Sequence, residues 1–423
     1  EASFIRGMMN HFKQLLSSLV ASPDIALREV EYLSEEEKNE LVNEFNKTSV
    51  EYPTDTTLIE LFKQRVADSP QNRALSHGET SLSYQELDLE SDKIAGYLKE
   101  ELNIVKGDRV LVSIPHDHHL LSALLAVMKL GAVYVPVDPS MPQERISFIK
   151  TDSNSKVVLD SDLLGQMLAW DGCEGVEIIP VSNEEGVQVV IYTSGSTGVP
   201  KGILLSNSGI MNRLNWMWNN YPFEAGEVGC AKTSLSFVDH IWEFYGPLLK
   251  GIPLEFYAKE NVLDVASFIA SLGAKGVTRI VLVPSLLKAI LDYPELVRKH
   301  LTKMNLWISS GSALKSQEVL RFYDTHQRAD VRLLNIYGST EVTADVTCFD
   351  TYDKYNKYQA YDLFEASITT KGAEKLMADF ETAEKIIENP SAKLAAESKY
   401  ADVSSQVELS KDEYFKFLVY ELV

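Results

Sequence analysis

A loop rich in glycine and hydroxyl side chains is the strongest chemical signal in the sequence. It runs Tyr192-Thr-Ser-Gly-Ser-Thr-Gly-Val-Pro-Lys-Gly202, between two short apolar runs at 187–191 and 203–205 that predict strands. The glycines let backbone amides approach a ligand, the hydroxyls donate hydrogen bonds, and the lysine adds a positive charge. Backbone amides, hydroxyls and a positive charge are the groups that bind a polyphosphate. The candidate binding residues are Thr193, Ser194, Gly195, Ser196, Thr197, Gly198 and Lys201.

Two alternatives apply to this loop. A Walker loop does not fit, because its second glycine would fall at Pro200 and no helix start follows Lys201 directly. On composition alone, an ordinary Gly/Ser surface turn is the default interpretation. The order of the residues is much more specific than their composition, so we favour the phosphate cradle.

A second motif, Leu333-Leu-Asn-Ile-Tyr-Gly-Ser-Thr-Glu341, places polar residues after an apolar run. Mg²⁺ prefers carboxylate oxygens and keeps several waters, so Glu341 alone could serve as its protein ligand. The alternative is a glutamate that stabilises a helix start through its charge.

Together the two motifs resemble those of the adenylate-forming superfamily, which includes acyl-CoA ligases, luciferases and the adenylation domains of nonribosomal peptide synthetases. The resemblance implies an α/β fold of two layered βαβ subdomains that meet at a nucleotide site, with ATP and Mg²⁺ as cofactors. It implies that Glu341 takes Mg²⁺ and that Thr340 lies by the α-phosphate. The expected catalytic residues are Thr193, Lys201, Thr340 and Glu341. The other expected nucleotide-binding residues are Gly311, Ser312, Ala313, Asn335, Tyr337 and Gly338.

The implied reaction is attack of a substrate carboxylate on the α-phosphorus of ATP, which gives an aminoacyl adenylate and pyrophosphate. Positioning and charge neutralisation supply most of such catalysis.

Asp239 is the residue that bears on the substrate. It stands near a predicted helix start, where a capping aspartate is the ordinary explanation. Trp242, three residues on, lies on the same helical face, so a carboxylate beside an indole could hold a substrate ammonium. In adenylation domains for α-amino acids the pocket aspartate directly follows the phenylalanine, at the position of Val238 here.

The matched motifs imply a substrate pocket whose series resembles that of adenylation domains activating β-alanine. In a β-amino acid the ammonium lies one methylene further from the carboxylate, so its countercharge must move too. The large apolar side chains would fill the space of a substrate side chain and favour a small substrate. The implied lining residues are Val238, Asp239, Trp242, Val281, Ile308, Ser310, Ile336, Ala344 and Asp345.

Alternating strands and helices position these motifs. We expect helices at 57–67, 84–98, 120–129, 141–150, 207–220 and 316–325, a hairpin at 74–83, and strands at 108–114, 132–137, 157–159 and 304–308. Residues from 163 to about 185 read as connecting material. This alternation predicts parallel βαβ units.

The run His116-Asp-His-His119 suggests a metal site, but adjacent residues after a strand cannot all converge on one ion without a contorted loop. We therefore favour a solvated loop between a strand and a helix.

Composition narrows the function classes. The 423 residues are 45% apolar with a net charge of -21, which indicates a globular chain with no nonspecific affinity for nucleic acid or anionic membrane. Cys173, Cys230 and Cys348 are far apart, so we expect reduced thiols and a cytoplasmic protein. We find neither a membrane span nor a signal peptide.

Four segments are expected. Residues 1–33 carry Phe4, Met8, Met9, Phe12, Leu15, Leu16 and Leu19, spaced as the buried stripe of a helix. They resemble the last helix of a condensation domain, and residues 34–50 resemble the following linker, with a capping box at Ser34 and Glu37 before a second helix. Residues 51–349 resemble an incomplete adenylation-domain core. Residues 350–423 are unassigned, with helical spacing at 373–387 and 409–422.

The expected function is activation of a small amino acid, with β-alanine favoured, in partnership with carrier and condensation domains of a multimodular synthetase. The later family motifs, including the lid and its catalytic lysine, do not appear in the sequence. The alternatives are a nucleotide- or amino-acid-binding assembly fragment without full turnover and an acyl-CoA ligase-like enzyme. Asp239 argues against the ligase, because a fatty-acid pocket has no use for a buried carboxylate.

Overall fold

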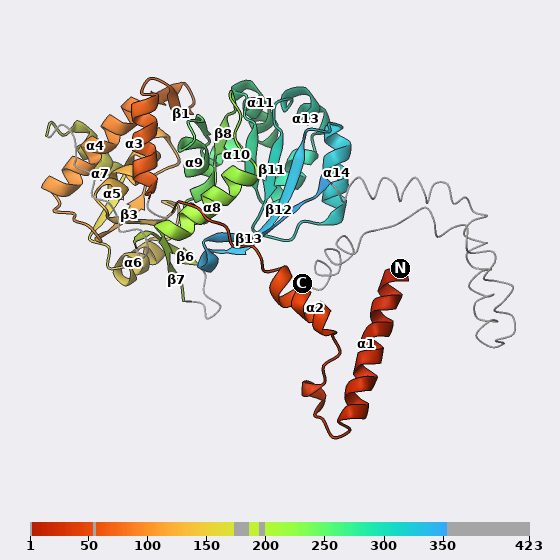
Figure 1. The fold of residues 1–423 in the computed structure, drawn as a ribbon. Coiled ribbons are helices and arrows are strands. Elements are labelled where there is room, and N and C mark those ends of the chain that lie inside the picture. Colours follow the sequence, from red (N-terminus) through yellow and green to blue (C-terminus); the bar gives the residue numbers. More distant parts are fainter. Residues whose placement is uncertain (1, 54–55, 173–185, 194–198, 353–423) are drawn as a thin grey trace. The chain divides into compact units, whose positions relative to one another are not determined.

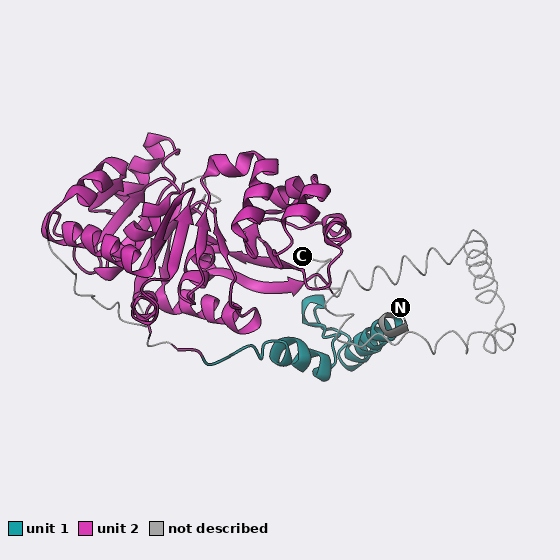
Figure 2. Cartoon of the chain, turned by 90° about the horizontal axis from the view of Figure 1, so that it is seen from above, with its two compact units in different colours: residues 1–51, 362–423 teal, residues 52–361 magenta. Residues whose placement is uncertain are grey.

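The computed structural model describes residues 2–53, 56–172, 186–193 and 199–352 (Figure 1). The predictions for residues 194–198, for Cys173 and for the segment beyond 352 lie outside these residues. The chain divides into two compact units, residues 1–51 with 362–423 and residues 52–361 (Figure 2), and each is described by itself.

The N-terminal residues form two helical segments. They contain α1 (Ala2–Ala21), η1 (Leu27–Glu29), α2 (Glu35–Asn39) and a π-helical turn η2 (Glu40–Glu44). The predicted capping box is confirmed, because the Glu37 amide donates to Ser34 Oγ and the Ser34 amide donates to the Glu37 carboxylate, both at 3.1 Å.

The predicted burial of the apolar stripe of α1 is wrong for most of its residues. Met8, Met9, Phe12 and Leu16 are 45–65% exposed, and Leu15 and Leu19 are half-buried. The spacing correctly predicted a helix, but in the described part of the chain no element covers this face.

An eight-stranded sheet forms the larger layer of residues 52–361. Its inner strands are mutually parallel, and the two edge strands, β13 and β2, pair antiparallel with their neighbours. In spatial order the strands are β13 (Ala344–Asp350), β12 (Arg332–Ser339), β11 (Leu306–Ser309), β10 (Arg279–Leu282), β8 (Gly229–Ala231), β9 (Leu254–Phe256), β1 (Arg73–His77) and β2 (Thr80–Ser83).

A five-stranded sheet forms the second layer. Its last two strands form an antiparallel pair around the predicted phosphate loop, in which Thr193 is paired with Lys201. In order the strands are β5 (Val157–Asp160), β3 (Arg109–Ser113), β4 (Val133–Pro136), β6 (Val187–Thr193) and β7 (Lys201–Ser206). The predicted α/β fold with two layers is confirmed.

Helices connect the strands of both sheets (Figure 1). Thr57, Ser83 and Ser206 each cap a helix, by accepting a hydrogen bond from the amide three residues on. The helices are α3 (Leu58–Asp68), α4 (Tyr84–Glu100), α5 (His118–Lys129), α6 (Gln143–Asp152), α7 (Ser161–Ala169), α8 (Asn207–Asn220), α9 (His240–Leu248), α10 (Lys259–Leu263), α11 (Val265–Lys275), α12 (Pro284–Leu291), α13 (Pro294–His300) and α14 (Ser316–His326).

Helix α7 was not predicted. Asp160 caps it by accepting from the Leu163 amide at 2.9 Å, and Leu164 and Met167 are buried. Its residues lie in the stretch that we had interpreted as connecting material, although the cap and the apolar spacing were visible in the sequence.

Two clusters of buried apolar residues pack against the eight-stranded sheet. The larger one joins it to the five-stranded sheet through α4, α5, α8 and α9, and contains Tyr84, Tyr134 and Phe244. The other lies beneath α11, α12, α13 and α14 around Trp307 and Phe322. The sheet is therefore covered on both faces, as parallel sheets generally are.

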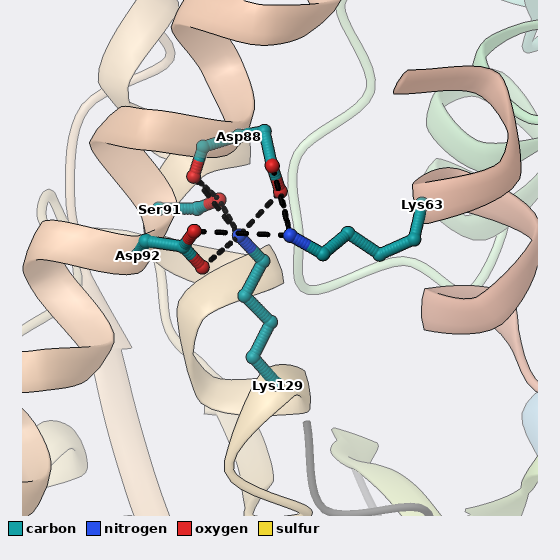
Figure 3. Close-up of polar contacts among 5 residues, drawn as sticks. All are labelled: Lys63, Asp88, Ser91, Asp92 and Lys129. Carbon is teal, nitrogen blue, oxygen red and sulfur yellow. Dashed lines mark hydrogen bonds and ion pairs between the residues drawn. The ribbon is translucent and has the colours of Figure 1, made fainter. Parts of the chain in front are cut away.

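A buried ion-pair network joins α3, α4 and α5 (Figure 3). Lys129 Nζ is fully buried and lies 2.7 Å from Asp88 Oδ1, 2.6 Å from Asp92 Oδ1 and 2.7 Å from Ser91 Oγ. Lys63 Nζ approaches the other oxygen of Asp88 at 2.8 Å. Burial lowers the pKa of Lys129, and the two aspartates oppose this shift. Because each charge has a partner, the network can exist where a single charge could not.

Candidate active site

The residues predicted for the substrate pocket gather at one edge of the eight-stranded sheet. Strands β8, β10, β11 and β12 are parallel, so the segments that follow them leave from the same edge. Asp239 follows β8 and Ser310 follows β11, while Val281 and Ile308 are direct neighbours in register. The topology thus brings together residues that lie up to about a hundred positions apart in the sequence.

Asp239 does not act as a helix cap. It stands at the start of α9, but its side chain accepts no hydrogen bond from the first turn, and it forms no ion pair with a described residue. Burial, then the charges of Asp345 and Glu243, raise the pKa of Asp239 to about 6, whereas Arg213 and a hydrogen bond with Ser310 lower it. The carboxyl is therefore half-buried and close enough to Asp345, Arg213 and Ser310 for each to change its pKa.

The apolar residues of the predicted pocket are buried. Trp242 is 5% exposed and stacks on Phe223, with ring centroids 5.9 Å apart. A Cβ on Gly246 would lie 2.6 Å from the indole, so only glycine leaves room for the ring there. The other predicted lining residues that are buried are Val238, Val281, Ile308, Ser310, Ile336 and Ala344.

Asp345 is ion-paired with Arg213, a residue that sequence reasoning missed. Arg213 Nε and Nη2 donate to one oxygen of Asp345 at 2.7 and 2.6 Å, and both side chains are less than 10% exposed. Arg213 could have been noticed, because it occupies the helical stripe formed by Ile210, Leu214 and Met217.

Exposed small residues lie beside the pocket. Gly311, Ser312 and Ala313 are exposed after β11, with Gly311 at φ +83°, and Tyr337 is 66% exposed on β12. Asn335 is half-buried and is paired in the sheet with Ser309 and Phe349. A flat, exposed surface of this kind fits the stacking of a purine base.

Lys201 and Glu341 come from different sheets and lie near each other. Lys201 begins β7, and Glu341 lies in the short helix η3 (Thr340–Val342), which contacts β7. Hydrogen bonds from its own backbone amide and from Ser339 lower the pKa of Glu341, and the charge of Lys201 lowers it further. Glu341 is thus an exposed, ionised carboxylate beside the strands that flank the phosphate loop, and it fits a Mg²⁺ ligand. Thr340 is half-buried next to it, and Thr193 faces Lys201 across the β6–β7 pair.

The histidine run does not form a metal site. Among the described residues, no group of three or more His, Cys, Asp or Glu side chains could hold a metal ion. The His116 ring packs against Phe244 and Phe256, while His119 pairs with Glu90 at 2.9 Å.

A hollow of about 620 Å³ lies elsewhere, beside the amino ends of β1, β8 and β9. Arg73, Trp218, Phe223 and Lys250 are among its lining residues. Parallel α/β sheets bind ligands at the carboxyl ends of their strands, so we assign the chemistry to the opposite edge, where Asp239 and Glu341 lie.

Comparison with known proteins identifies the family of the chain. Residues 62–364 match the family model described as AMP-binding enzyme. The chain belongs to this family of AMP-binding enzymes. The predicted resemblance and the predicted class of enzyme are confirmed, and the matched range contains the whole candidate site.

The relatives of this AMP-binding enzyme include large peptide synthetases. Tyrocidine synthase 3 of Brevibacillus parabrevis is 31% identical over 361 residues, which are 81% of this chain and 5% of that protein. The beta-alanyl-bioamine nonribosomal peptide synthetase ebony of Drosophila melanogaster is 35% identical over 265 residues, 57% of this chain and 30% of that protein. The chain therefore spans only a small part of these relatives.

Solved structures share the fold. The nonribosomal peptide synthetase FmoA3, in its AMPPNP-bound form, superposes with a TM-score of 0.71 at 20% identity, over 82% of this chain and 38% of that chain. The N-terminal subdomain of NpsA from Klebsiella oxytoca, in complex with 3-hydroxyanthranilyl-AMSN, gives 0.62 at 22% identity, over 70% and 75%. No helix in the described part of the chain has the length and apolar character needed to cross a membrane.

Proposed function

We propose that this chain carries the nucleotide- and amino-acid-binding core of an adenylation domain that activates a small amino acid, with β-alanine as its substrate. The observation that carries the proposal is Asp239, a half-buried carboxyl that caps no helix and pairs with no described cation. An ionised carboxylate in such a place needs a countercharge. The ammonium of an amino acid would supply it.

The reaction transfers an adenylyl group. A carboxylate oxygen of the amino acid attacks the α-phosphorus of ATP, and a new oxygen–phosphorus bond forms. The bond between the α-phosphorus and the bridging oxygen of the β-phosphate breaks, and pyrophosphate leaves with that electron pair. No redox partner is needed, and the amino group keeps its protons, so its charge stays available for Asp239.

The residues around the site divide the remaining tasks. Gly311, Ser312, Ala313 and Tyr337 would hold the adenine, and Thr340 would lie by the α-phosphate. Lys201 would neutralise phosphate charge, together with the loop residues that follow Thr193. Glu341 would hold Mg²⁺, which when bound supplies charge neutralisation for the triphosphate.

The slot beside Asp239 favours a substrate without a side chain. Trp242, Val281 and Ile308 are at most 6% exposed, so their side chains would fill the space that a substrate side chain would need. The relative whose name includes beta-alanyl agrees with this choice. A fatty acid would leave Asp239 without a countercharge, so an acyl-CoA ligase-like function is disfavoured.

Binding of stable adenylate mimics tests the substrate directly. Calorimetry on the whole chain should show that β-alanyl sulfamoyladenosine binds at least tenfold more tightly than its phenylalanyl and hexanoyl counterparts. Asp239→Ala should remove this preference. Asp264→Ala is a matched control, because Asp264 caps α11 by accepting from Ser267 and should affect stability but not binding. Equal affinity for the hexanoyl mimic would refute the pocket assignment.

Pyrophosphate exchange separates a complete enzyme from a binding fragment. β-Alanine-dependent exchange of label between pyrophosphate and ATP indicates turnover. Tight binding of the mimic without exchange would instead support the nucleotide- and amino-acid-binding fragment. Alanine, phenylalanine and hexanoate serve as the competing substrates.

A further inference from the structure

Arg213 occupies a position where a core helix would normally carry an apolar residue. It lies one turn after Gly209 on α8, and a Cβ on Gly209 would come within 2.8 Å of Thr343 Oγ1. The same face of α8 therefore contacts the turn before β13 at Gly209 and pairs with Asp345 at Arg213. The close approach of α8 to Thr343 at Gly209 brings Arg213 within reach of Asp345.

Two indole rings lie near the guanidinium of Arg213. It lies 5.5 Å from the ring centroid of Trp216 and 5.5 Å from that of Trp242. Arginine can stack on aromatic rings and donate two N–H bonds to a carboxylate at the same time, which lysine cannot. Nη1 is buried and has no hydrogen-bond partner among the described residues. The guanidinium therefore pairs its charge with Asp345 but leaves one of its nitrogens without a hydrogen bond to a described residue.

We propose that Arg213 is a specificity-determining residue, which cancels the charge of Asp345 and leaves Asp239 as the single unmatched anion of the pocket. The pocket then accepts a substrate with one ammonium group and rejects a substrate with two. This inference rests on the proposed function, because it concerns the amino-acid pocket of the same site.

Counting the charges around the pocket gives this selectivity. Asp239 and Asp345 contribute two negative charges and Arg213 one positive charge, so one negative charge remains. Glu243 does not change the sum, because it pairs with Lys232 at 3.4 Å and accepts from the Thr233 amide at 2.7 Å. A substrate with one ammonium makes the pocket neutral. A second ammonium would leave a buried charge unmatched, which is unfavourable.

A set of three mimics tests the charge rule. The β-alanyl, 3-amino-2-hydroxypropanoyl and 2,3-diaminopropanoyl sulfamoyladenosines differ only at the second carbon, and the hydroxyl compound is a neutral control for the size of the extra amine. The wild-type chain should bind the diamino mimic at least tenfold more weakly than the hydroxyl mimic at pH 7.5. Arg213→Met, which keeps much of the packing volume, should shift this ratio at least tenfold toward the diamino mimic.

The double variant separates charge from structural damage. Arg213→Met with Asp345→Asn again leaves one negative charge, so the ratio should return to within threefold of the wild-type value, although the ion pair is lost. An unchanged ratio in Arg213→Met, or a double variant that keeps the shifted ratio, would overturn the proposal.

A ligand-free measurement distinguishes failure of the inference from failure of the proposed function. If the wild-type chain binds AMPPNP but none of the three mimics, the proposed substrate class is wrong. Thermal unfolding between pH 5 and 8 then still tests the charge balance among Asp239, Asp345, Glu243, Lys232 and Arg213. Arg213→Met should lose stability more steeply with rising pH than the wild type, and the double variant should not. Equal slopes in all three proteins would refute the role of Arg213.

Discussion

Gly338 lies so close to Ala344 that a Cβ atom on the glycine would stand 1.7 Å from the Ala344 carbonyl oxygen. Gly338 lies near the end of β12 and Ala344 begins β13, and at the turn between them Thr343 and Ala344 adopt positive φ angles of 60° and 87°. Such angles are unfavourable for residues with a Cβ and often mark functional sites. The glycine of the second sequence motif therefore has a steric role that does not involve the nucleotide.

Substitution of Gly338 should disrupt the turn. Gly338→Ala cannot be accommodated without moving the backbone of β13, so we expect a loss in unfolding free energy of at least about 1–3 kcal/mol. Weaker binding of AMPPNP should accompany it, because Tyr337 and Glu341 flank the turn. Gly165→Ala in α7 is the control, since its Cβ would meet nothing within 4 Å and should stabilise the helix by roughly 0.5–1 kcal/mol. Similar melting temperatures for the two variants would contradict this steric role.

Asp239 should reduce stability at neutral pH. Its folded pKa of about 6 lies above the ordinary value of 3.8, so between these values the folded chain retains a proton that the unfolded chain has lost. Stability therefore falls as pH rises through this window, and the penalty is complete above pH 6. It amounts to at most about 3 kcal/mol. Asp239→Asn should unfold at a higher temperature than wild type at pH 7.5, and at nearly the same temperature at pH 4. A variant that is less stable at pH 7.5 would show that the carboxylate is compensated.

Substrate binding should have the opposite dependence on pH. Only the ionised form of Asp239 can pair with an ammonium, so the affinity for β-alanyl sulfamoyladenosine should decrease below pH 6, by up to about tenfold per pH unit. Asp239→Asn should bind weakly, without this dependence. Calorimetry at pH 5, 6 and 7.5 measures the effect. A flat profile for the wild-type chain would place the ammonium elsewhere.

The network around Lys129 should be sensitive to removal of a single member. Lys129→Met leaves Asp88 and Asp92 buried beside only Lys63, so we expect a loss of about 3–5 kcal/mol in unfolding free energy. Adding Asp92→Asn to that variant should recover part of the loss. Glu295→Gln at an exposed pair should change stability by less than about 0.5 kcal/mol. Denaturant unfolding compares the four proteins, and equal midpoints would contradict the role of the network.

Much of the fold could be predicted because its signals are local. The hairpin at 74–83, the capping box at Ser34 and the apolar runs around the phosphate loop depend only on nearby residues. Helix α7 is the exception, because a helix of nine residues has only a short apolar stripe beside the cap at Asp160. The uncovered face of α1 could not have been predicted from spacing, since spacing shows which residues share a face but not what covers it.

The pocket could be predicted only in part. Asp239, Trp242 and Asp345 were placed through matched motifs, but the partner of Asp345 lies 132 residues away on a helix with ordinary amphipathic spacing. The sequence also gives no sign that Gly246 is important, because its importance depends on the ring of Trp242 one turn earlier. An ion pair between residues far apart in the sequence can be recognised only when the fold shows that their helix and strand lie side by side.

The edge strand β13 also sets a limit for protein engineering. Thr351, just beyond it, donates from Oγ1 to the Leu333 carbonyl at 2.8 Å, and its hydroxyl lies 3.0 Å from that of Tyr323. A variant of this AMP-binding enzyme that is shortened before Thr351 would lose both contacts, which hold the end of the strand that carries Asp345. A variant shortened before Asp345 would also leave Arg213 without its ion-pair partner.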